Sequence, residues 1–162
     1  MKESIRLKTE DFYFKFRCAG LIIKNNKVLV VEMDNNGYYC LPGGYVEVGE
    51  TTEEAVIREL KEEIGKDVRI LGYLGMIENY FTTKSLRRMH EISCYYLMEL
   101  IEDVPTEDFS LIENDKGYIV KLDFKWIDIN EIDNYIIKPK FLKELVKQPN
   151  LEFKHLIFSD MV

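Results

Sequence analysis

Three glutamates near the end of one short segment carry the clearest chemical signal in the sequence. They are Glu59, Glu62 and Glu63, in the stretch LPGGYVEVGETTEEAVIRELKEEIGK from Leu41 to Lys66. On a helix, spacings of three and four residues bring all three carboxylates onto one stripe. Oxygen ligands gathered in this way suit Mg²⁺ or Mn²⁺, hard cations that keep several waters and complete their shells with substrate phosphates.

A solvated helix face is the plainer interpretation of three neighbouring acids, but two energetic costs count against it. Glu59 and Glu63, four residues apart, repel each other by roughly a few tenths of a kcal/mol. Glu62 and Glu63 lie in the last turn, where the helix dipole disfavours an anion by roughly 0.3 to 1 kcal/mol. A bound divalent cation removes both costs. We also expect the small side chain of Ala55, one turn earlier, to leave the space in front of the carboxylates open.

The ends of this helix are well marked in the sequence. Thr51 and Glu54 form a T-x-x-E capping box, and Gly65 follows the last periodic residue, where a left-handed cap belongs. We therefore predict a helix from Thr52 to Ile64. The apolar stripe expected to face the core consists of Val56, Ile57, Leu60 and Ile64.

Two further features of the segment concern its loop. Arg58 projects between Glu54 and Glu62, which favours an ion pair that orients the carboxylate stripe, with Glu50 in the preceding loop as a further acceptor. Pro42-Gly43-Gly44 is expected to form a turn whose backbone can approach a metal or a diphosphate closely. A purely structural turn explains those three residues equally well.

The rest of the chain predicts a sheet flanked by helices. Phe14 to Ile23 and Lys27 to Met33 form a hairpin across Lys24-Asn25-Asn26, and Tyr38 to Leu41 is a short strand. Further strands are predicted at Val68 to Phe81, His90 to Ile101 and Tyr118 to Ile127. A final helix begins near Pro139 and turns Phe141, Leu142, Leu145 and Val146 inward. This order of elements predicts an α+β or layered αβα fold with a mixed sheet.

Composition bounds the class of protein. The chain has 162 residues, 46% hydrophobic and 31% charged, which fits one domain covering residues 1–162. A net charge of −7 and no basic run longer than Arg87-Arg88 argue against long nucleic acid as a partner. The apolar stretches fall short of the roughly 18 residues that a membrane span needs. Residues 1–15 contain no apolar run of signal-peptide length, so we expect a cytoplasmic protein.

The cysteines indicate no metal site or disulfide framework. Cys18, Cys40 and Cys94 are odd in number and widely spaced, without a CxxC pair. We expect buried thiols in a reducing compartment.

The spacing within the glutamate segment resembles that of a known family. Gly44, five residues, Glu50, seven residues and then RELKEEIG from Arg58 to Gly65 match the Nudix box at every fixed position. Residues 44–66 make up the box. Only its closing position departs, because Lys66 stands where the family usually has an aliphatic residue, with Val68 two residues later. That position packs and does no chemistry in the family.

The resemblance implies an αβα sandwich with a loop-helix-loop motif that binds one to three Mg²⁺ ions. By this resemblance, the metal ligands are Glu59, Glu62, Glu63 and the carbonyl of Gly44, while Arg58 and Glu50 form a structural salt bridge. The implied reaction is attack of a metal-activated water on one phosphorus of a diphosphate in a small nucleotide.

The general base stays open, because the family takes it from the box or from a later loop. Glu59 is the first choice, and Glu107, Glu113 and Asp123 are the alternatives. Arg17, with Gly43 and Gly44, is expected to contact the substrate. His90 at a strand end and His155 in a surface tail are not expected to be catalytic.

Subfamily markers leave the substrate open. No proline lies between Gly43 and Val104, so a marker of many ADP-ribose pyrophosphatases is missing, and the arginine-rich signature of coenzyme A pyrophosphatases is absent. The remainder resembles the broad group that includes enzymes that sanitise nucleoside triphosphates. Hydrolases of ADP-ribose, dinucleoside polyphosphates or RNA ends are alternatives, as is a sensor that binds a nucleotide without cleaving it. The three retained glutamates argue against the sensor. A homodimer is compatible with the sequence.

Overall fold

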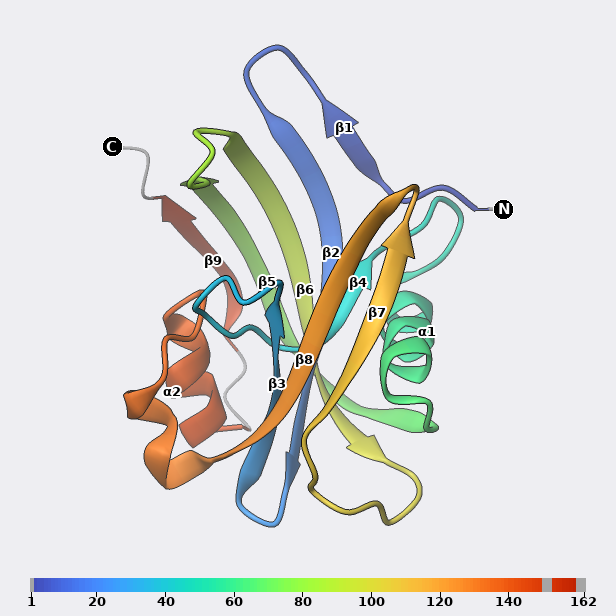
Figure 1. Cartoon of the computed structure of the whole chain (residues 1–162), viewed down its shortest axis with the longest axis vertical. Coiled ribbons are helices and arrows are strands. Elements are labelled where there is room, and N and C mark those ends of the chain that lie inside the picture. Colours follow the sequence, from blue (N-terminus) through green and yellow to red (C-terminus); the bar gives the residue numbers. More distant parts are fainter. Residues whose placement is uncertain (1, 150–152, 160–162) are drawn as a thin grey trace.

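The computed structural model describes residues 2–149 and 153–159, which form one twisted sheet between two helices (Figure 1). The elements in chain order are β1 (Arg6–Lys8), β2 (Tyr13–Lys24), β3 (Lys27–Met33), β4 (Gly43–Tyr45), α1 (Thr52–Ile64), β5 (Val68–Thr82), β6 (Arg88–Leu100), β7 (Phe109–Asp115), β8 (Tyr118–Asp128), a 3-10 helix (Ile129–Asn134), α2 (Phe141–Lys147) and β9 (Lys154–Ser159).

The sheet is mixed, as predicted, and runs in the order β7-β8-β3-β2-β6-β5-β9, with β1 and β4 also paired to β2. β2 is parallel to β6 and β5 is parallel to β9, whereas β3 and β8 are antiparallel. β2 and β3 pair only beside their turn, at Ile23↔Val28 and Lys24↔Lys27. The two strands then diverge, and β4 pairs with β2 on the side left free.

The helices cover opposite faces of this sheet (Figure 1). Val56 and Leu60 of α1 belong to one buried cluster. Leu142 and Leu145 of α2 belong to the other. The α+β fold with its αβα layering is therefore confirmed. No helix in the described ranges is long and apolar enough to cross a bilayer.

Helix α1 begins and ends where the sequence predicts. Both halves of the capping box between Thr51 and Glu54 form, and Gly65 adopts the left-handed conformation with φ 71°. Two expectations about its faces were wrong. Ile57 is 40% exposed, because the apolar stripe is narrower than predicted. Ala55 is fully buried in the core under the helix, so its small side chain allows close packing and does not open space before the carboxylates.

The segment before α1 also differs from the prediction. Gly43 and Gly44 form no tight turn, because they extend as β4, where Cys18 lies opposite Gly44 and Ala19 opposite Gly43. The predicted strand from Tyr38 to Leu41 makes only isolated bridges, through Tyr39 and Cys40.

Four strands were not predicted. Besides β4, they are β1, which is short, β7, in the polar stretch before Gly117, and β9, which includes His155 where a surface tail was expected. Apart from Tyr38 to Leu41, the predicted strands are confirmed, and the hairpin between β2 and β3 turns through left-handed Asn25 and Asn26. Helix α2 begins at Phe141, two residues after the predicted Pro139.

Candidate active site

The three glutamates of α1 differ in their exposure to solvent. Glu63 is buried, with 7% of its surface exposed. The Glu59 side chain is 14% exposed, and the Glu62 side chain lies at the rim with 57% exposed. The predicted stripe therefore runs from the protein interior to solvent, as a site that meets a substrate from outside must.

Arg58 organises this stripe. Its guanidinium donates to both oxygens of Glu50, at 2.6 and 3.0 Å, and to the carbonyl oxygen of Tyr45 at 3.0 Å. The remaining nitrogen, Nη1, donates to Glu59 at 2.8 Å and to Glu62 at 3.4 Å. One cation thus ties the loop before the helix, strand β4 and two of the glutamates together, which matches the ion pair expected from the sequence.

Strand β4 supplies the backbone that faces the glutamates. A Cβ on Gly44 would lie 2.3 Å from the carboxyl carbon of Glu59, so only glycine permits this approach. The backbone amide of Gly43 lowers the pKa of Glu63 and so stabilises its charged form. The Gly44 carbonyl, expected to be a metal ligand, accepts a weak hydrogen bond from the Cys18 thiol at 3.7 Å. Backbone polar groups of the loop and carboxylates of the helix therefore share one small volume.

Burial makes the glutamate charges costly. Burial raises the pKa of Glu59, although Arg58 opposes the shift. Burial, and then the negative charge of Glu59, raises the pKa of Glu63 well above its ordinary value. The Oε2 atom of Glu63 is buried with no hydrogen-bond partner among the described residues. A buried carboxylate in this state requires a proton or a cation, and a hard divalent ion fits the oxygen donors.

A fourth carboxylate reaches this group from β7. Glu113 lies opposite Val120 on β8, and its negative charge raises the pKa of both Glu59 and Glu63. Burial and the charge of Glu62 raise the pKa of Glu113 in turn. Along β7, Phe109, Leu111, Glu113 and Asp115 are half-buried, whereas the residues between them are exposed. The sequence signal by which β7 could have been predicted is the run Phe109 to Ile112, which is bounded by the turn residues Asn114 to Gly117.

The other two candidates for the general base lie elsewhere. Asp123 is opposite Ser110, so it faces the other side of the sheet from Glu113. It accepts a hydrogen bond from Ser110 and pairs with Lys121 at 3.2 Å. Glu107 is exposed in the loop before β7. The structure therefore brings only Glu113 of these three to the α1 glutamates.

Arg17 reaches the same region from β2. Its side chain is 23% exposed, and Nη1 lies 3.9 Å from Oε2 of Glu91 on β6. Burial lowers the pKa of Arg17, but the charge of Glu91 and smaller contributions from Cys40 and Tyr45 together outweigh this, and the net shift is upward. The positive charge of Arg17 also lowers the pKa of Glu63 and of Glu113. A permanent cation therefore stands beside the carboxylate group.

Comparison with known proteins agrees with this geometry. The model of the NUDIX domain matches residues 15–147, which include most of β2, strands β3 to β8, α1 and α2. The chain belongs to the Nudix family.

Two curated relatives align with only part of this chain. An ADP-ribose pyrophosphatase of Methanocaldococcus jannaschii is 42% identical over 85 residues, which are 51% of this chain and 48% of that protein. An NAD-capped RNA hydrolase, NudC, of Vibrio atlanticus is 41% identical over 63 residues, which are 37% of this chain and 23% of that one. This Nudix chain thus aligns with less than half the length of either relative.

Solved structures share the fold over almost the whole chain. The crystal structure of a Nudix hydrolase from Nitrosomonas europaea superposes with a TM-score of 0.62 at 17% identity, covering 98% of this chain and 96% of that one. At this identity the comparison supports the Nudix fold alone.

Two features of the Nudix chain bear on metal and ligand sites. In residues 2–149 and 153–159, no group of three or more Asp, Glu, Cys or His side chains is arranged closely enough to hold a metal ion by itself. Mg²⁺ does not need such a group, because it keeps several waters and binds through one or two carboxylates plus substrate phosphates.

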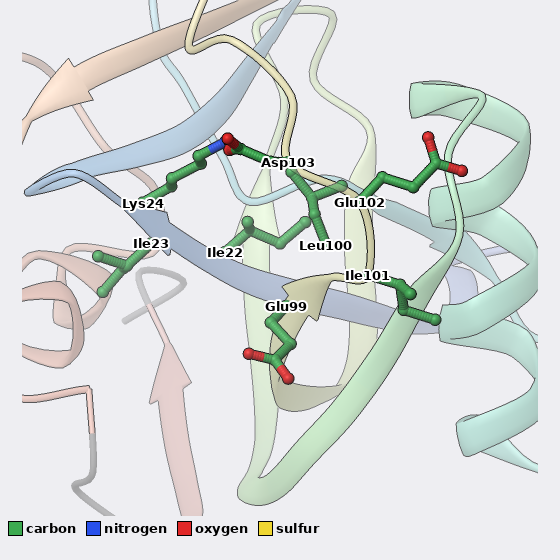
Figure 2. Close-up of a pocket in the computed structure, with 8 residues that line it drawn as sticks. All are labelled: Ile22, Ile23, Lys24, Glu99, Leu100, Ile101, Glu102 and Asp103. Atoms are coloured by element: carbon green, nitrogen blue, oxygen red, sulfur yellow. The ribbon is translucent and has the colours of Figure 1, made fainter.

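Two cavities of about 300 and 290 Å³ contain no box residue. The first lies between the ends of β2 and β6, where Lys24 points to Asp103 (Figure 2).

Proposed function

We propose that this Nudix chain is a cytoplasmic, divalent-metal-dependent hydrolase that splits the diphosphate of a small nucleoside-diphosphate compound with water. The observation that carries the proposal is the buried Oε2 of Glu63, which has no hydrogen-bond partner among the described residues and lies beside Glu59 in a box that keeps all three glutamates. A sensor that only binds nucleotides would not need to keep this unfavourable charge.

Glu59, Glu62 and Glu63 would hold Mg²⁺ or Mn²⁺, with the carbonyl of Gly44 as a further ligand. The bound ion would lower the pKa of a water and neutralise charge on the attacking and leaving oxygens. Arg58 donates to Oε1 of Glu59, which leaves Oε2 outside this hydrogen bond. Glu59 therefore remains our first choice for the base that accepts the proton of the attacking water.

Glu113 is the alternative base. It lies close enough for its charge to raise the pKa of Glu59 and Glu63, and it comes from a strand outside the box. Arg17 would bind a phosphate of the substrate, because it is a cation on β2 whose charge acts on the buried Glu63.

The substrate class follows from charge and from the relatives. A net charge of −7 suits a small anion captured through metal ions better than a long RNA. The likeness to an ADP-ribose pyrophosphatase makes ADP-ribose a specific candidate beside nucleoside triphosphates, despite the missing proline.

The test is a panel of ADP-ribose, nucleoside triphosphates, dinucleoside polyphosphates and NAD, incubated with the purified protein in Mg²⁺, Mn²⁺ or EDTA. We expect turnover of at least one compound in metal and none in EDTA, with restoration when metal is returned. Carrying out the reaction in ¹⁸O-water should label one phosphate product, which identifies the phosphorus attacked. Undiminished turnover after complete chelation would refute the metal mechanism, and no turnover of any compound would refute the hydrolase.

A further inference from the structure

A row of polar side chains continues from the carboxylate site across the sheet. Glu91 on β6 lies opposite Lys15 on β2 and Asn79 on β5. Residues directly opposite one another share a face, and Arg17, two residues along from Lys15, lies on that face too. Arg17 and Glu91 thus extend the site away from α1.

The contact between these two residues is unlike the structural ion pair of the same site. Arg58 holds Glu50 at 2.6 and 3.0 Å through two hydrogen bonds, and the Glu50 side chain is only 4% exposed. Arg17 and Glu91 are 3.9 Å apart, too far for a hydrogen bond, with side chains 23% and 13% exposed. Structural pairs of arginine and carboxylate frequently adopt the bidentate geometry seen at Arg58, and this contact does not.

Both side chains retain hydrogen-bonding capacity. The guanidinium of Arg17 has five N–H donors, and none meets an acceptor within the part of the chain that the structure describes. Within residues 2–149 and 153–159, the carboxylate of Glu91 accepts a single long hydrogen bond, from Oγ of Ser93 at 3.4 Å. Half-buried charged groups normally have hydrogen-bond partners. Because Arg17 and Glu91 lack close ones, their donors and acceptors are free to bind a ligand.

The positions of Arg17 and Glu91 indicate which part of a bound substrate lies at each residue. Arg17 on β2 lies opposite Tyr45 of β4, the strand that faces the glutamates, so it is on the reaction side. Glu91 lies on β6, which pairs with β2 and is therefore one strand farther from β4. A substrate whose diphosphate lies at the glutamates and Arg17 presents to Glu91 the group bonded next to the phosphate, which in a nucleotide is the sugar.

We propose that Glu91 is a specificity-determining residue that accepts hydrogen bonds from the 2′- and 3′-hydroxyls of the substrate ribose. A carboxylate can only accept, and its two oxygens match the two donors of a vicinal diol. Lys15 and Asn79 flank Glu91 on the same face. The assignment rests on the proposed function only for the position of the diphosphate.

The first measurement compares kcat/KM for ATP with kcat/KM for 2′-deoxy-ATP, 3′-deoxy-ATP and 2′,3′-dideoxy-ATP. The second compares the binding affinities of AMP and 2′,3′-dideoxy-AMP by calorimetry. The wild type should favour the ribose compound over the dideoxy compound by about 10- to 100-fold, the range for hydrogen bonds to a charged acceptor. Glu91→Ala should bring this ratio close to one, and the isosteric Glu91→Gln should reduce it. Glu78→Gln is the matched control, because Glu78 lies on the other face of β5 and pairs with His155.

The two proposals fail in different ways. Ribose-selective binding that Glu91→Ala abolishes, without turnover of any nucleotide, supports the Glu91 assignment and overturns the hydrolase. Turnover in Mg²⁺ with a sugar ratio that neither Glu91 variant changes overturns the Glu91 assignment alone. An equal loss of kcat/KM for all sugars would overturn it as well, since Glu91 would then only position Arg17. Thermal melts identify a variant that fails to fold, in which case Glu91→Gln decides.

Discussion

The guanidinium of Arg58 holds both carboxylate oxygens of Glu50, at 2.6 and 3.0 Å, and its remaining nitrogen, Nη1, holds Glu59 at 2.8 Å. A single planar group therefore anchors the loop before α1 and orients a proposed metal ligand. Lysine cannot reproduce this, because its ammonium is a point charge without the fork geometry.

Arg58→Lys should lower kcat/KM at least about tenfold and the free energy of unfolding by about 1 to 3 kcal/mol, since Glu50 is left buried with a poorer partner. Steady-state rates and urea unfolding measure the two effects. Arg69→Lys is the control, because Arg69 is 64% exposed and its ion pair with Glu99 should contribute little. Wild-type rates in Arg58→Lys would show that the orientation of Glu59 does not depend on the fork.

Glu59→Gln, Glu62→Gln and Glu63→Gln should each lower activity by roughly 100-fold or more, because each removes a charge from the proposed cation site. In EDTA, Glu63→Gln should be more stable than the wild type by about 0.5 kcal/mol, because it removes a buried charge that repels Glu59. Glu62→Gln should change stability little, since that side chain is 57% exposed.

The control for these variants is Glu53→Gln, in the first turn of α1, where an anion is favoured. It should lose a little stability and no activity. Thermal melts in EDTA and rates in saturating Mg²⁺ would be measured on all four proteins. Near-wild-type rates in the three box variants would remove the basis for assigning these carboxylates as metal ligands.

Gly43→Ala and Gly44→Ala should separate stability from activity. A Cβ on Gly43 would lie 2.0 Å from the carbonyl oxygen of Cys18, which is backbone and cannot move away, so this variant should lose about 3 kcal/mol or more. A Cβ on Gly44 meets the end of the Glu59 side chain, which can rotate. Gly44→Ala should therefore melt near the wild type but lose most activity. Equal melting temperatures for the two variants would contradict this distinction.

Lys66→Val should leave activity unchanged and alter stability by no more than about 0.5 kcal/mol. Lys66 is 45% exposed and pairs loosely with Glu102 at 3.5 Å, whereas Val68 is buried and occupies the core at this end of the helix. A loss of rate comparable to that of Glu63→Gln would show that the last box position takes part in catalysis.

Local sequence signals predicted the parts of the site that lie within one helix. These parts are the capping box at Thr51, the left-handed cap at Gly65 and the glutamate stripe. They depend on contacts within about four residues, so the periodicity and spacing of the sequence are enough to predict them. The same holds for the hairpin of β2 and β3, whose turn uses Asn25 and Asn26 in left-handed conformations.

The tertiary structure alone decided which distant groups join the helix. Gly43 and Gly44 read as a turn because glycine permits many conformations, but pairing with β2 extends them as β4. Glu113, Asp123 and Glu107 are equivalent acids in the sequence. Only the register of β7 on β8 turns Glu113 toward α1 and Asp123 away from it, because a shift of one residue reverses the face of every side chain. The approach of Arg17 and Glu91 likewise depends on the parallel pairing of β2 with β6, two strands separated by more than 60 residues along the chain, which no local pattern specifies.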